Sequence, residues 1–457
     1  MVGAGLSGVE SAVVMSDLGY GVTLSDSRDR SELGAAAIRV EEAGAELSGP
    51  PQTGDLIKGM DLVVKSPGVP AENAIVAAAY HAAIPVWSEV ELAYRLLPNS
   101  FIGVTGTNGK TTTAALLGHI FRVAGRPVRV LGNIGEPVVS AVGRVSPDEE
   151  LVVELSSFQL EDVHEFRPAA AILLNVTQDH LDRHPTMEHY FRSKGRLFAR
   201  QSVGDSAVLN LDDEYARRLG RELTDREGGP AIAYISAQDS EGAQSFVRRG
   251  DLFLVGTRTL AVEEVSLRGP HNMENCLAAA TAALHRDVEL EAVVEGLRSF
   301  PGVPHRLRVA GIVAGVEYVN DSKATNVGAA LKALAAYPEG THVILGGRDK
   351  GSDYFPLAWA CAHLGVRGVY AIGEAAPLIV DAFRRAADHM GGVSIPETCG
   401  TLEVAVRRAS ENAEWGEVVL LAPACSSFDQ FRSFEERGNR FLELVEDLRR
   451  GASPDER

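Results

Sequence analysis

One string constrains the fold of this chain more than any other, the letters G-T-N-G-K-T at residues 106–111. An apolar run at residues 101–104 precedes it, and an amphipathic stretch from Thr112 to Ala124 follows and stops at Gly125. A strand, a glycine-rich turn and a helix in this order are typical of a phosphate-binding loop, in which backbone N–H groups and the helix start surround phosphate oxygens. The sequence therefore predicts an α/β domain that binds a nucleotide.

The side chains of this loop suggest how the nucleotide is held. Lys110 can reach the β- and γ-phosphates, and the Thr111 hydroxyl can bind Mg²⁺. The general motif has a glycine five residues before Gly109, where this chain has Val104, so the alternative is a glycine turn that only joins strand to helix. The predicted nucleotide-binding residues are Gly106, Thr107, Asn108, Gly109, Lys110, Thr111 and Thr112.

Strands and helices alternate along the rest of the chain. Short apolar runs end in turns at residues 22–24, 61–64, 341–345, 368–372 and 418–422, and helical segments lie between them. This alternation predicts mostly parallel sheets with helices on both faces. At roughly 150 residues per domain, a chain of 457 residues suggests about three domains. Breaks at residues 97–100 and 299–304 place them at 1–98, 99–302 and 303–450, and residues 451–457 are expected to be a disordered tail.

A second glycine string, G-A-G-L-S-G at residues 3–8, has only Met1 and Val2 in front of it. A buried strand normally precedes such a loop. Either the start lies too late or the first strand is vestigial, and the sequence leaves both open. Taken alone, the string and Asp26 suggest a dinucleotide site; the alternatives are close helix–strand packing or another kind of nucleotide site.

Charge and cysteine content restrict the partners and the compartment. Lys and Arg number 44 against 62 Asp and Glu, for a net charge of -18, which disfavours nucleic acid and anionic membranes as partners. The sequence has no apolar run of membrane-spanning length and no signal-peptide pattern. Its four cysteines are scattered without a C-x-x-C spacing, which favours free thiols. We expect a cytoplasmic protein with no membrane or nucleic-acid partner.

Polar residues follow several other predicted strands. Glu154 ends an apolar run and suits a Mg²⁺ ligand, although it could also cap a helix. Asp179 and His180 follow the apolar run at residues 172–174. Asn272 and Asn275 begin a helix, where they could cap it or hold a base or a phosphate. Because ligands of open α/β sheets bind at the carboxyl ends of the strands, all of these are site candidates.

Three polar strings follow strands in the last third of the chain. They are N-D-S-K-A-T-N at residues 320–326, G-G-R-D-K at 346–350 and A-C-S-S-F-D-Q-F at 424–431. Each could be an elaborate helix cap. Each could equally form part of a substrate site at the sheet edge, with Lys323 paired to an anion.

Taken together, these strings resemble the Mur ligase family over nearly the whole chain. G-T-N-G-K-T looks like the ATP signature shared by Mur ligases and folylpolyglutamate synthases. P-G-V-P-H-R, N-D-S-K-A-T-N and P-A-C-S-S-F-D-Q-F look like strings of the members that add D-glutamate. The resemblance implies a Rossmann-like N-terminal domain for the UDP part of the substrate, a central P-loop ATPase domain and a Rossmann-like C-terminal domain that brings D-glutamate.

The resemblance also implies the reaction. It would be ATP-dependent formation of the amide bond between UDP-N-acetylmuramoyl-L-alanine and D-glutamate, through an acyl phosphate, in peptidoglycan precursor synthesis. ATP and two Mg²⁺ ions would be the cofactors, and we expect a monomer. The alternatives are a sister ligase for another amino acid, a non-catalytic nucleotide-binding regulator, and an NAD-dependent dehydrogenase built on residues 3–8.

Site residues carry over by position. The implied metal ligands are Thr111, Glu154, His180 and Lys194, the last as a carbamate, although composition alone marks Lys194 as an exposed lysine. The implied catalytic residues are Lys110, Lys194, His180 and Asp179, and either of the last two could take the amine proton. Further ATP residues would be Asn272, Asn275, Arg306, Asp321 and Lys323. Substrate residues would be Leu6, Ser7, Asp26, Ser27 and Arg28 for the UDP part, Asn133 for the muramoyl part, and Thr325, Lys350, Ser427 and Phe434 for D-glutamate.

Overall fold

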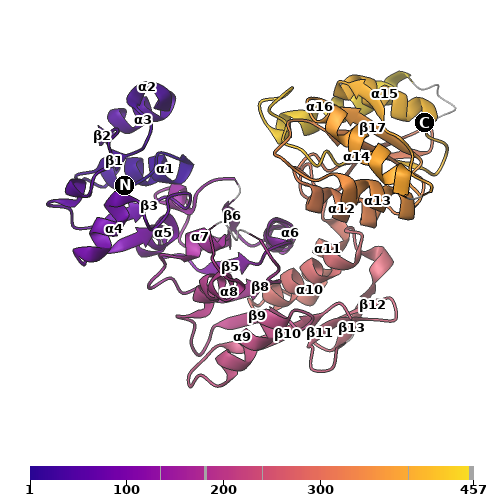
Figure 1. The fold of residues 1–457 in the computed structure, drawn as a ribbon. Coiled ribbons are helices and arrows are strands. Elements are labelled where there is room, and N and C mark those ends of the chain that lie inside the picture. Colours follow the sequence, from indigo (N-terminus) through magenta and orange to yellow (C-terminus); the bar gives the residue numbers. More distant parts are fainter. Residues whose placement is uncertain (134, 180–182, 239, 390, 452–457) are drawn as a thin grey trace. The chain divides into compact units, whose positions relative to one another are not determined.

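The computed structural model describes residues 1–133, 135–179, 183–238, 240–389 and 391–451. The chain divides into two compact units, Met1–Phe300 and Pro301–Arg457, coloured from indigo to pink and from orange to yellow in Figure 1. Within the described part, two small parallel strand pairs, a nine-stranded sheet and a six-stranded sheet confirm the predicted α/β class. No helix among the described residues is both long and apolar enough to cross a bilayer.

The first part of unit 1 is built on two parallel strand pairs, β1–β2 and β3–β4. Its strands are β1 (Thr23–Ser25), β2 (Glu46–Ser48), β3 (Val63–Lys65) and β4 (Val86–Ser88), and its helices are α1 (Leu6–Asp17), α2 (Arg30–Leu33), α3 (Ala35–Glu42), η1 (Gly54–Ile57), α4 (Ala74–His81) and α5 (Glu89–Leu96). Val2 joins the two pairs, because it makes parallel bridges to Ser25 and to Lys65. A single residue therefore occupies the place where a strand normally precedes the glycine loop.

The nine-stranded sheet fills the rest of unit 1, in the order β13-β12-β11-β10-β9-β8-β5-β7-β6. The strands are β5 (Phe101–Thr105), β6 (Val128–Gly132), β7 (Glu150–Glu154), β8 (Ala170–Leu173), β9 (Ser206–Asn210), β10 (Ala231–Ser236), β11 (Ser245–Arg248), β12 (Asp251–Leu254) and β13 (Thr257–Ala261). Among the described strands of this sheet, only the pairs β11–β12 and β12–β13 are antiparallel. Strand β5 lies between β7 and β8, and all five of its residues are buried, as expected for an apolar run covered on both faces.

Helices cover both faces of this sheet. They are α6 (Lys110–Val123), η2 (Val138–Ala141), α7 (Ser157–Leu160), α8 (Met187–Gly195), η3 (Arg196–Phe198), α9 (Glu214–Thr224), η4 (Val262–Glu264), α10 (Pro270–Leu284) and α11 (Leu290–Ser299). Helix α6 packs against α10 and α11. Tyr94, Phe101 and Phe166 form an aromatic cluster, in which the rings meet edge to face with centroids 5.4 to 5.6 Å apart. This packing holds β5 and the loop that follows it in place.

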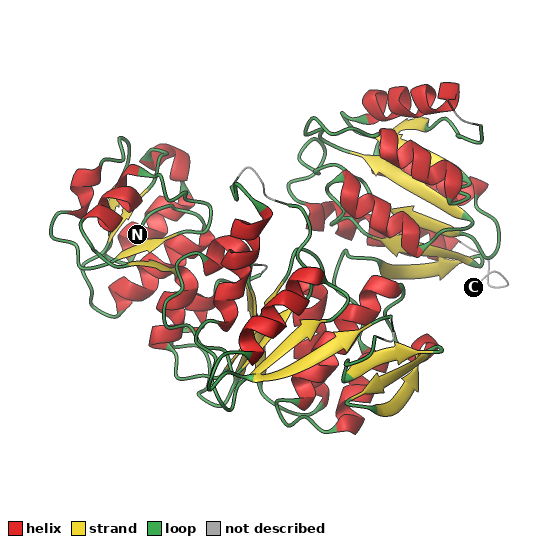
Figure 2. Cartoon of the chain, turned by 60° about the horizontal axis from the view of Figure 1, so that its bottom comes forward, coloured by secondary structure: helices red, strands yellow, loops and turns green. Residues whose placement is uncertain are grey.

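Unit 2 is a six-stranded sheet in the order β14-β15-β19-β16-β17-β18, with only β14 antiparallel. The elements are β14 (Arg308–Val313), β15 (Val316–Asn320), α12 (Val327–Ala336), β16 (Thr341–Gly346), α13 (Phe355–His363), β17 (Gly368–Ile372), α14 (Ala376–His389), β18 (Glu397–Gly400), α15 (Leu402–Asn412), β19 (Val418–Leu421) and α16 (Phe434–Gly451). Alternate residues face opposite sides: Val343 and Leu345 pack under α12 to α14, and Ile344 under α15 and α16. Figure 2 shows helices on both sides of this sheet.

A buried ion cluster ties the first part of unit 1 to the nine-stranded sheet. Lys65 ends β3, is 1% exposed, and places its Nζ 3.0 Å from Glu161 Oε2 and 2.7 Å from Asp162 Oδ2. The Tyr80 hydroxyl donates to Asp162 Oδ1 (2.5 Å), and the Arg183 guanidinium donates to Glu161 Oε2 (2.8 Å). Because Arg183 also pairs with Glu161, removing Lys65 leaves the buried Asp162 carboxylate as the one without its cation.

Replacing Lys65 by methionine is therefore expected to lower the free energy of unfolding of unit 1 by about 3 kcal/mol. Chemical denaturation measures this change. Lys58→Met is the matched control, because Lys58 pairs with Asp55 at the surface and both side chains are 78% exposed; its effect on the free energy of unfolding should be far smaller, since solvent screens an exposed ion pair. Equal effects of the two substitutions would contradict a stabilising role for the buried cluster.

Candidate active site

The predicted phosphate loop lies at the carboxyl end of β5, with α6 beginning at Lys110. Gly106 has φ 153° and Gly109 has φ 87°, which L-residues other than glycine rarely adopt. A Cβ atom on Gly109 would also lie 2.2 Å from Asn275 Oδ1. The strand, turn and helix thus stand in the order that the sequence predicts.

A neighbouring strand end braces this loop. The Thr107 N–H donates to the Asn175 carbonyl, and the Asn108 N–H donates to Asn175 Oδ1, both at 2.9 Å. The Thr107 hydroxyl donates to the Thr177 carbonyl (3.1 Å). Sequence reasoning did not single out Asn175 or Thr177 as site residues. Their only signal is their position just after β8, the neighbour of β5.

Two lysines converge on the loop carbonyls. Lys110 Nζ donates to the carbonyls of Gly106 and Thr107, both at 2.9 Å. Lys194 reaches the same place from α8, and its Nζ donates to the Gly106 carbonyl at 2.8 Å. Lys194 also lies 4.4 Å from the centre of the Tyr190 ring, whose hydroxyl is 3.3 Å from Thr107 Oγ1. A lysine that composition marks as exposed is in fact 1% exposed.

The protonation of Lys194 follows from this placement. Burial, and then the positive charge of Lys110, lower the pKa of Lys194 well below its ordinary value. The charge of Asp179 acts in the opposite direction, so this predicted catalytic residue lies within electrostatic reach of the amine. His180, the other predicted base and a predicted metal ligand, lies outside the described residues.

Glu154 and Asn133 meet at the same sheet edge. Glu154 is the last residue of β7, is 3% exposed, and accepts a hydrogen bond from Asn133 Nδ2 at its Oε1 (3.1 Å). The Asn133 N–H donates to the Glu154 carbonyl (2.9 Å), so the ends of β6 and β7 are held together. A predicted metal ligand and a predicted substrate residue are thus neighbours beside the phosphate loop.

The predicted adenine residues lie behind the loop on α10. Asn275 Nδ2 donates to Asn272 Oδ1 (3.0 Å), and the Thr113 hydroxyl of α6 donates to Asn275 Oδ1 (3.3 Å). Both asparagines are buried. Asn275 therefore fixes α10 against the start of α6 through its side-chain oxygen.

The N-terminal glycine loop is fixed by Asp26. Asp26 Oδ2 accepts from the Ala4 N–H (2.6 Å), and Oδ1 accepts from the Arg28 backbone N–H and from Arg28 Nε, both at 2.9 Å. Burial raises the pKa of Asp26, but these hydrogen bonds and the Arg28 charge outweigh it and lower the pKa to about 2. Of the other predicted residues here, Leu6 and Ser27 are exposed and Ser7 is half-buried. The loop thus presents Leu6 to solvent above a fixed carboxylate.

In unit 2, three strand ends bring the remaining predicted residues to one edge. Strands β15, β19 and β16 are neighbours in the sheet and run parallel. Their following loops carry Asp321, Lys323 and Thr325 after β15, Lys350 after β16, and Ser427 after β19, with Phe434 at the start of α16. These loops lie up to about a hundred residues apart in the chain, and the order of the strands in the sheet makes them neighbours.

The groups at this edge differ in exposure. Asp321 is buried and accepts from the Leu307 N–H at its Oδ1 (3.2 Å). Burial raises the pKa of Asp321 to about 6, against the opposing charge of Arg306. Lys323 Nζ lies 6.0 Å from the centre of the Phe434 ring. Lys350 is exposed and Ser427 is buried.

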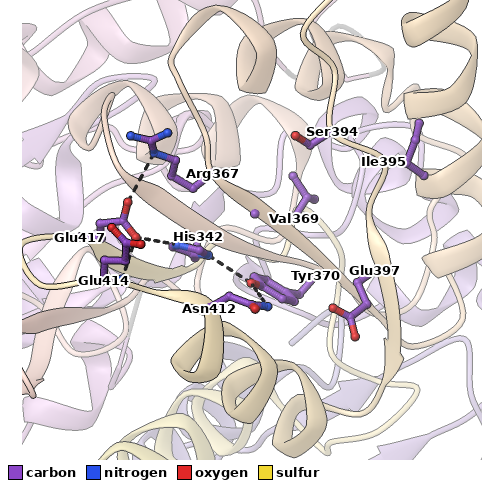
Figure 3. Close-up of a pocket in the computed structure, with 11 residues that line it drawn as sticks. His342, Arg367, Val369, Tyr370, Ser394, Ile395, Glu397, Asn412, Glu414 and Glu417 are labelled. Carbon is purple, nitrogen blue, oxygen red and sulfur yellow. Dashed lines mark hydrogen bonds and ion pairs between the residues drawn. The ribbon is translucent and has the colours of Figure 1, made fainter.

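A separate polar cavity of about 440 Å³ lies at the opposite, amino-terminal edge of this sheet (Figure 3). His342 bonds to Glu417 Oε2 (2.9 Å) and to the Tyr370 hydroxyl (3.1 Å), and Asn412 Nδ2 donates to that hydroxyl (3.1 Å). Its lining, all among the described residues, includes none of the predicted site residues. The central groups bond to one another, so we read this cavity as structural.

Comparison with known proteins agrees with this geometry. Residues 104–283 match the family model described as the Mur ligase middle domain, and residues 305–425 match the one described as the Mur ligase, glutamate ligase domain. UDP-N-acetylmuramoylalanine–D-glutamate ligases from Solibacter usitatus and Myxococcus xanthus are 43% and 42% identical to this chain; each alignment covers 98% of this chain and 97% of the relative. A third, from Acidobacterium capsulatum, is 41% identical over 97% of this chain and 95% of its own.

Solved structures show the same fold at lower identity. A UDP-N-acetylmuramate–alanine ligase from Thermotoga maritima superposes with a TM-score of 0.59 at 18% identity, covering 98% of both chains. A pseudomurein peptide ligase from Methanothermus fervidus gives 0.55 at 18% identity, over 98% of this chain and 99% of its own. With two family models matched over most of its length and relatives above 40% identity from end to end, the chain belongs to the Mur ligase family.

Proposed function

We propose that this chain is the ATP-dependent ligase that joins D-glutamate to UDP-N-acetylmuramoyl-L-alanine in peptidoglycan precursor synthesis. Near full-length relatives of that name, more than 40% identical, support the substrates. One observation of the structure carries the chemistry: Lys110 and the buried Lys194 converge on the Gly106 carbonyl of the phosphate loop. This arrangement fits a site that transfers a phosphoryl group to an anionic acceptor.

A carboxylate is a poor electrophile, so it must be activated before an amide can form. The alanyl carboxylate attacks the γ-phosphorus of ATP, giving an acyl phosphate and ADP. The amine of D-glutamate then attacks the acyl carbon; the C–N bond forms, the amine loses a proton and phosphate leaves. The first step brings two anions together, so Lys110 and the N-terminal end of helix α6 stabilise the negative charge, with Arg306 as a further cation.

We also propose that two Mg²⁺ ions bind at this edge. Thr111 and Glu154 would hold one ion, and His180 and carbamylated Lys194 would support the second. Among the described residues, no group of three or more His, Cys, Asp or Glu could form a complete cage. Mg²⁺ binds through few protein oxygens together with phosphates and water. The buried Glu154 carboxylate supplies such an oxygen. Bound there, Mg²⁺ would neutralise charge on the phosphates.

Lys194 has the properties of a lysine that can be carbamylated. The amine must be neutral to attack the carbon of CO₂, and burial lowers the pKa of Lys194 well below its ordinary value, which increases the neutral fraction of the amine. Formation of the N–C bond with loss of a proton gives an anionic carbamate. Carbon-13 NMR of the protein in labelled bicarbonate should show a carbamate signal that is missing from Lys194→Met, whether or not the enzyme turns over.

The remaining assignments follow from positions in the family. The chain would have three domains, 1–98, 99–302 and 303–450, and would act as a cytoplasmic monomer. The UDP part would bind at Leu6, Ser7, Asp26, Ser27 and Arg28, the muramoyl part at Asn133, the adenine at Asn272 and Asn275, further ATP groups at Asp321 and Lys323, and D-glutamate at Thr325, Lys350, Ser427 and Phe434. Asp179 or His180 would take the amine proton.

The decisive experiment measures phosphate release from ATP with UDP-N-acetylmuramoyl-L-alanine present. D-Glutamate is compared with L-glutamate, L-lysine and meso-diaminopimelate. We expect release with D-glutamate alone. Release with another amino acid would move the chain to a sister ligase, and release with none would reject the proposed activity.

A further inference from the structure

Helix α16 buries an arginine at the edge of the second sheet. Arg437 lies in its first turn and is 1% exposed, the largest fully buried side chain of the described residues. Burial lowers the pKa of Arg437 to about 10, so the guanidinium is still charged at neutral pH. The structure pairs it with no carboxylate at ion-pair distance among the described residues. A buried charge of this kind needs its hydrogen bonds.

Those hydrogen bonds go to two loops of the candidate D-glutamate site. Arg437 Nε donates to Ser322 Oγ (2.9 Å), and Nη2 donates to the Ser322 carbonyl (2.8 Å) in the loop after β15. Nη2 also donates to the Cys425 carbonyl (3.2 Å), and Nη1 to the Ser426 carbonyl (3.4 Å), in the loop after β19. The Ser322 hydroxyl in turn donates a hydrogen bond to the Phe434 carbonyl (2.8 Å).

The third loop, which follows β16, packs against the same guanidinium group. Arg348 donates its backbone N–H to the Ser426 carbonyl (2.9 Å). A Cβ atom on Gly347 would lie 2.2 Å from the Ser426 carbonyl oxygen and 3.1 Å from Arg437 Nη1. The guanidinium therefore lies where the loops carrying Thr325, Lys350 and Ser427 meet. Its planar fork can bond several carbonyls at once, which the single ammonium of a lysine cannot reproduce.

We propose that Arg437 is a positioning residue for the amino-acid substrate, holding the three loops of unit 2 in the one arrangement that binds D-glutamate. This inference rests on the proposed function. Arg437 is buried beneath the loops and acts through Ser322, Cys425 and Ser426. A purely structural arginine would lower the apparent kcat through the amount of folded protein and would leave each KM unchanged. A positioning arginine raises the KM for the one substrate that those loops bind.

The test compares Arg437→Lys with Arg440→Met, a control on the same helix whose arginine bonds to Glu403 and Glu443 at the surface. In Arg437→Lys, losing several charge-assisted hydrogen bonds should raise the KM for D-glutamate by about tenfold or more. The KM for UDP-N-acetylmuramoyl-L-alanine, which we assign to unit 1, should stay within about twofold. Arg440→Met should change neither.

Three results separate the possible failures. No D-glutamate-dependent release by the unmodified enzyme would reject the proposed function itself. A folded Arg437→Lys enzyme with an unchanged KM for D-glutamate would overturn the positioning role. If Arg437→Lys fails to fold, Ser322→Ala serves instead, because it removes one acceptor of Arg437 and keeps the charge. It should raise that KM about threefold or more, because it removes both hydrogen bonds of the Ser322 hydroxyl, and an unchanged value would overturn the inference.

Discussion

Replacing Lys110 by methionine is expected to lower kcat by about a thousandfold or more, which is typical for loss of a group that stabilises charge in phosphoryl transfer. Its Nζ donates to the Gly106 and Thr107 carbonyls, at the place where the loop would hold phosphates. Its side chain is only half-buried, so the free energy of unfolding should change by less than about 1 kcal/mol. Phosphate release at saturating substrates measures the first effect, and chemical denaturation the second.

Arg122→Met is the matched control, since Arg122 is an exposed cation in the last turn of the same helix. It should retain full activity, because its charge lies far along α6 from the loop. A Lys110→Met enzyme that kept more than about a tenth of the rate would show that the phosphate loop is not where phosphoryl transfer takes place.

The fold could be predicted because local patterns decide most of it. The apolar runs at residues 101–104, 368–372 and 418–422 become β5, β17 and β19 with bounds that differ by no more than one residue. The antiparallel edge β11–β13 was not foreseen. These strands have only four or five residues, and β11 and β13 are mostly exposed or half-buried and lack an apolar run; only β12 has one, at residues 252–254. A hairpin between β11 and β12 turns at Arg249 and Gly250, both at positive φ.

The candidate site is harder to predict from the sequence than the fold, because it is formed by contacts between residues that lie far apart in the chain. Lys194 lies 88 residues from Gly106, and nothing in the polar pattern of its helix indicates that its amine is buried. Asn175 braces a loop 67 residues before it, through an amide that resembles any turn asparagine. In contrast, the phosphate loop is local, so its seven residues could be named directly. Resemblance to a family, and not periodicity, identified Lys194.

The order of the strands in the second sheet is another reason why the site is hard to predict from the sequence. The loops after β15, β16 and β19 are far apart in sequence, and only the order β15-β19-β16 makes them neighbours. The rule that ligands bind at the carboxyl ends of strands selects candidate loops without saying which of them contact one another. The burial of Arg437 could not be predicted from the sequence. Its helix sequence, F-E-E-R-G-N-R, is as polar as that of a surface helix, and Arg437 is buried because three loops converge on it.

Replacing Lys194 by methionine is expected to abolish activity, by about a thousandfold or more, and at the same time to stabilise the protein at pH 7 in CO₂-free buffer. The pKa of Lys194 is lowered in the folded protein, whereas the unfolded chain binds the proton up to about pH 10.4. Between these two pKa values the unfolded state holds more protons, so the free energy of unfolding rises with pH at up to about 1.4 kcal/mol per pH unit. Methionine keeps the volume and removes this penalty.

Denaturation curves of both proteins between pH 7 and pH 10 measure the effect, because the difference between them isolates this one residue from all other titrating groups. The unmodified protein should gain stability relative to Lys194→Met as the pH rises. Bicarbonate adds the second test: a carbamate forms only on the folded, neutral amine, so it should stabilise the unmodified protein, raise its activity and leave Lys194→Met unchanged. If the stability difference between the two proteins depends on pH but does not respond to bicarbonate, Lys194 is a buried amine that carries no carbamate. That result would contradict the proposed carbamylation.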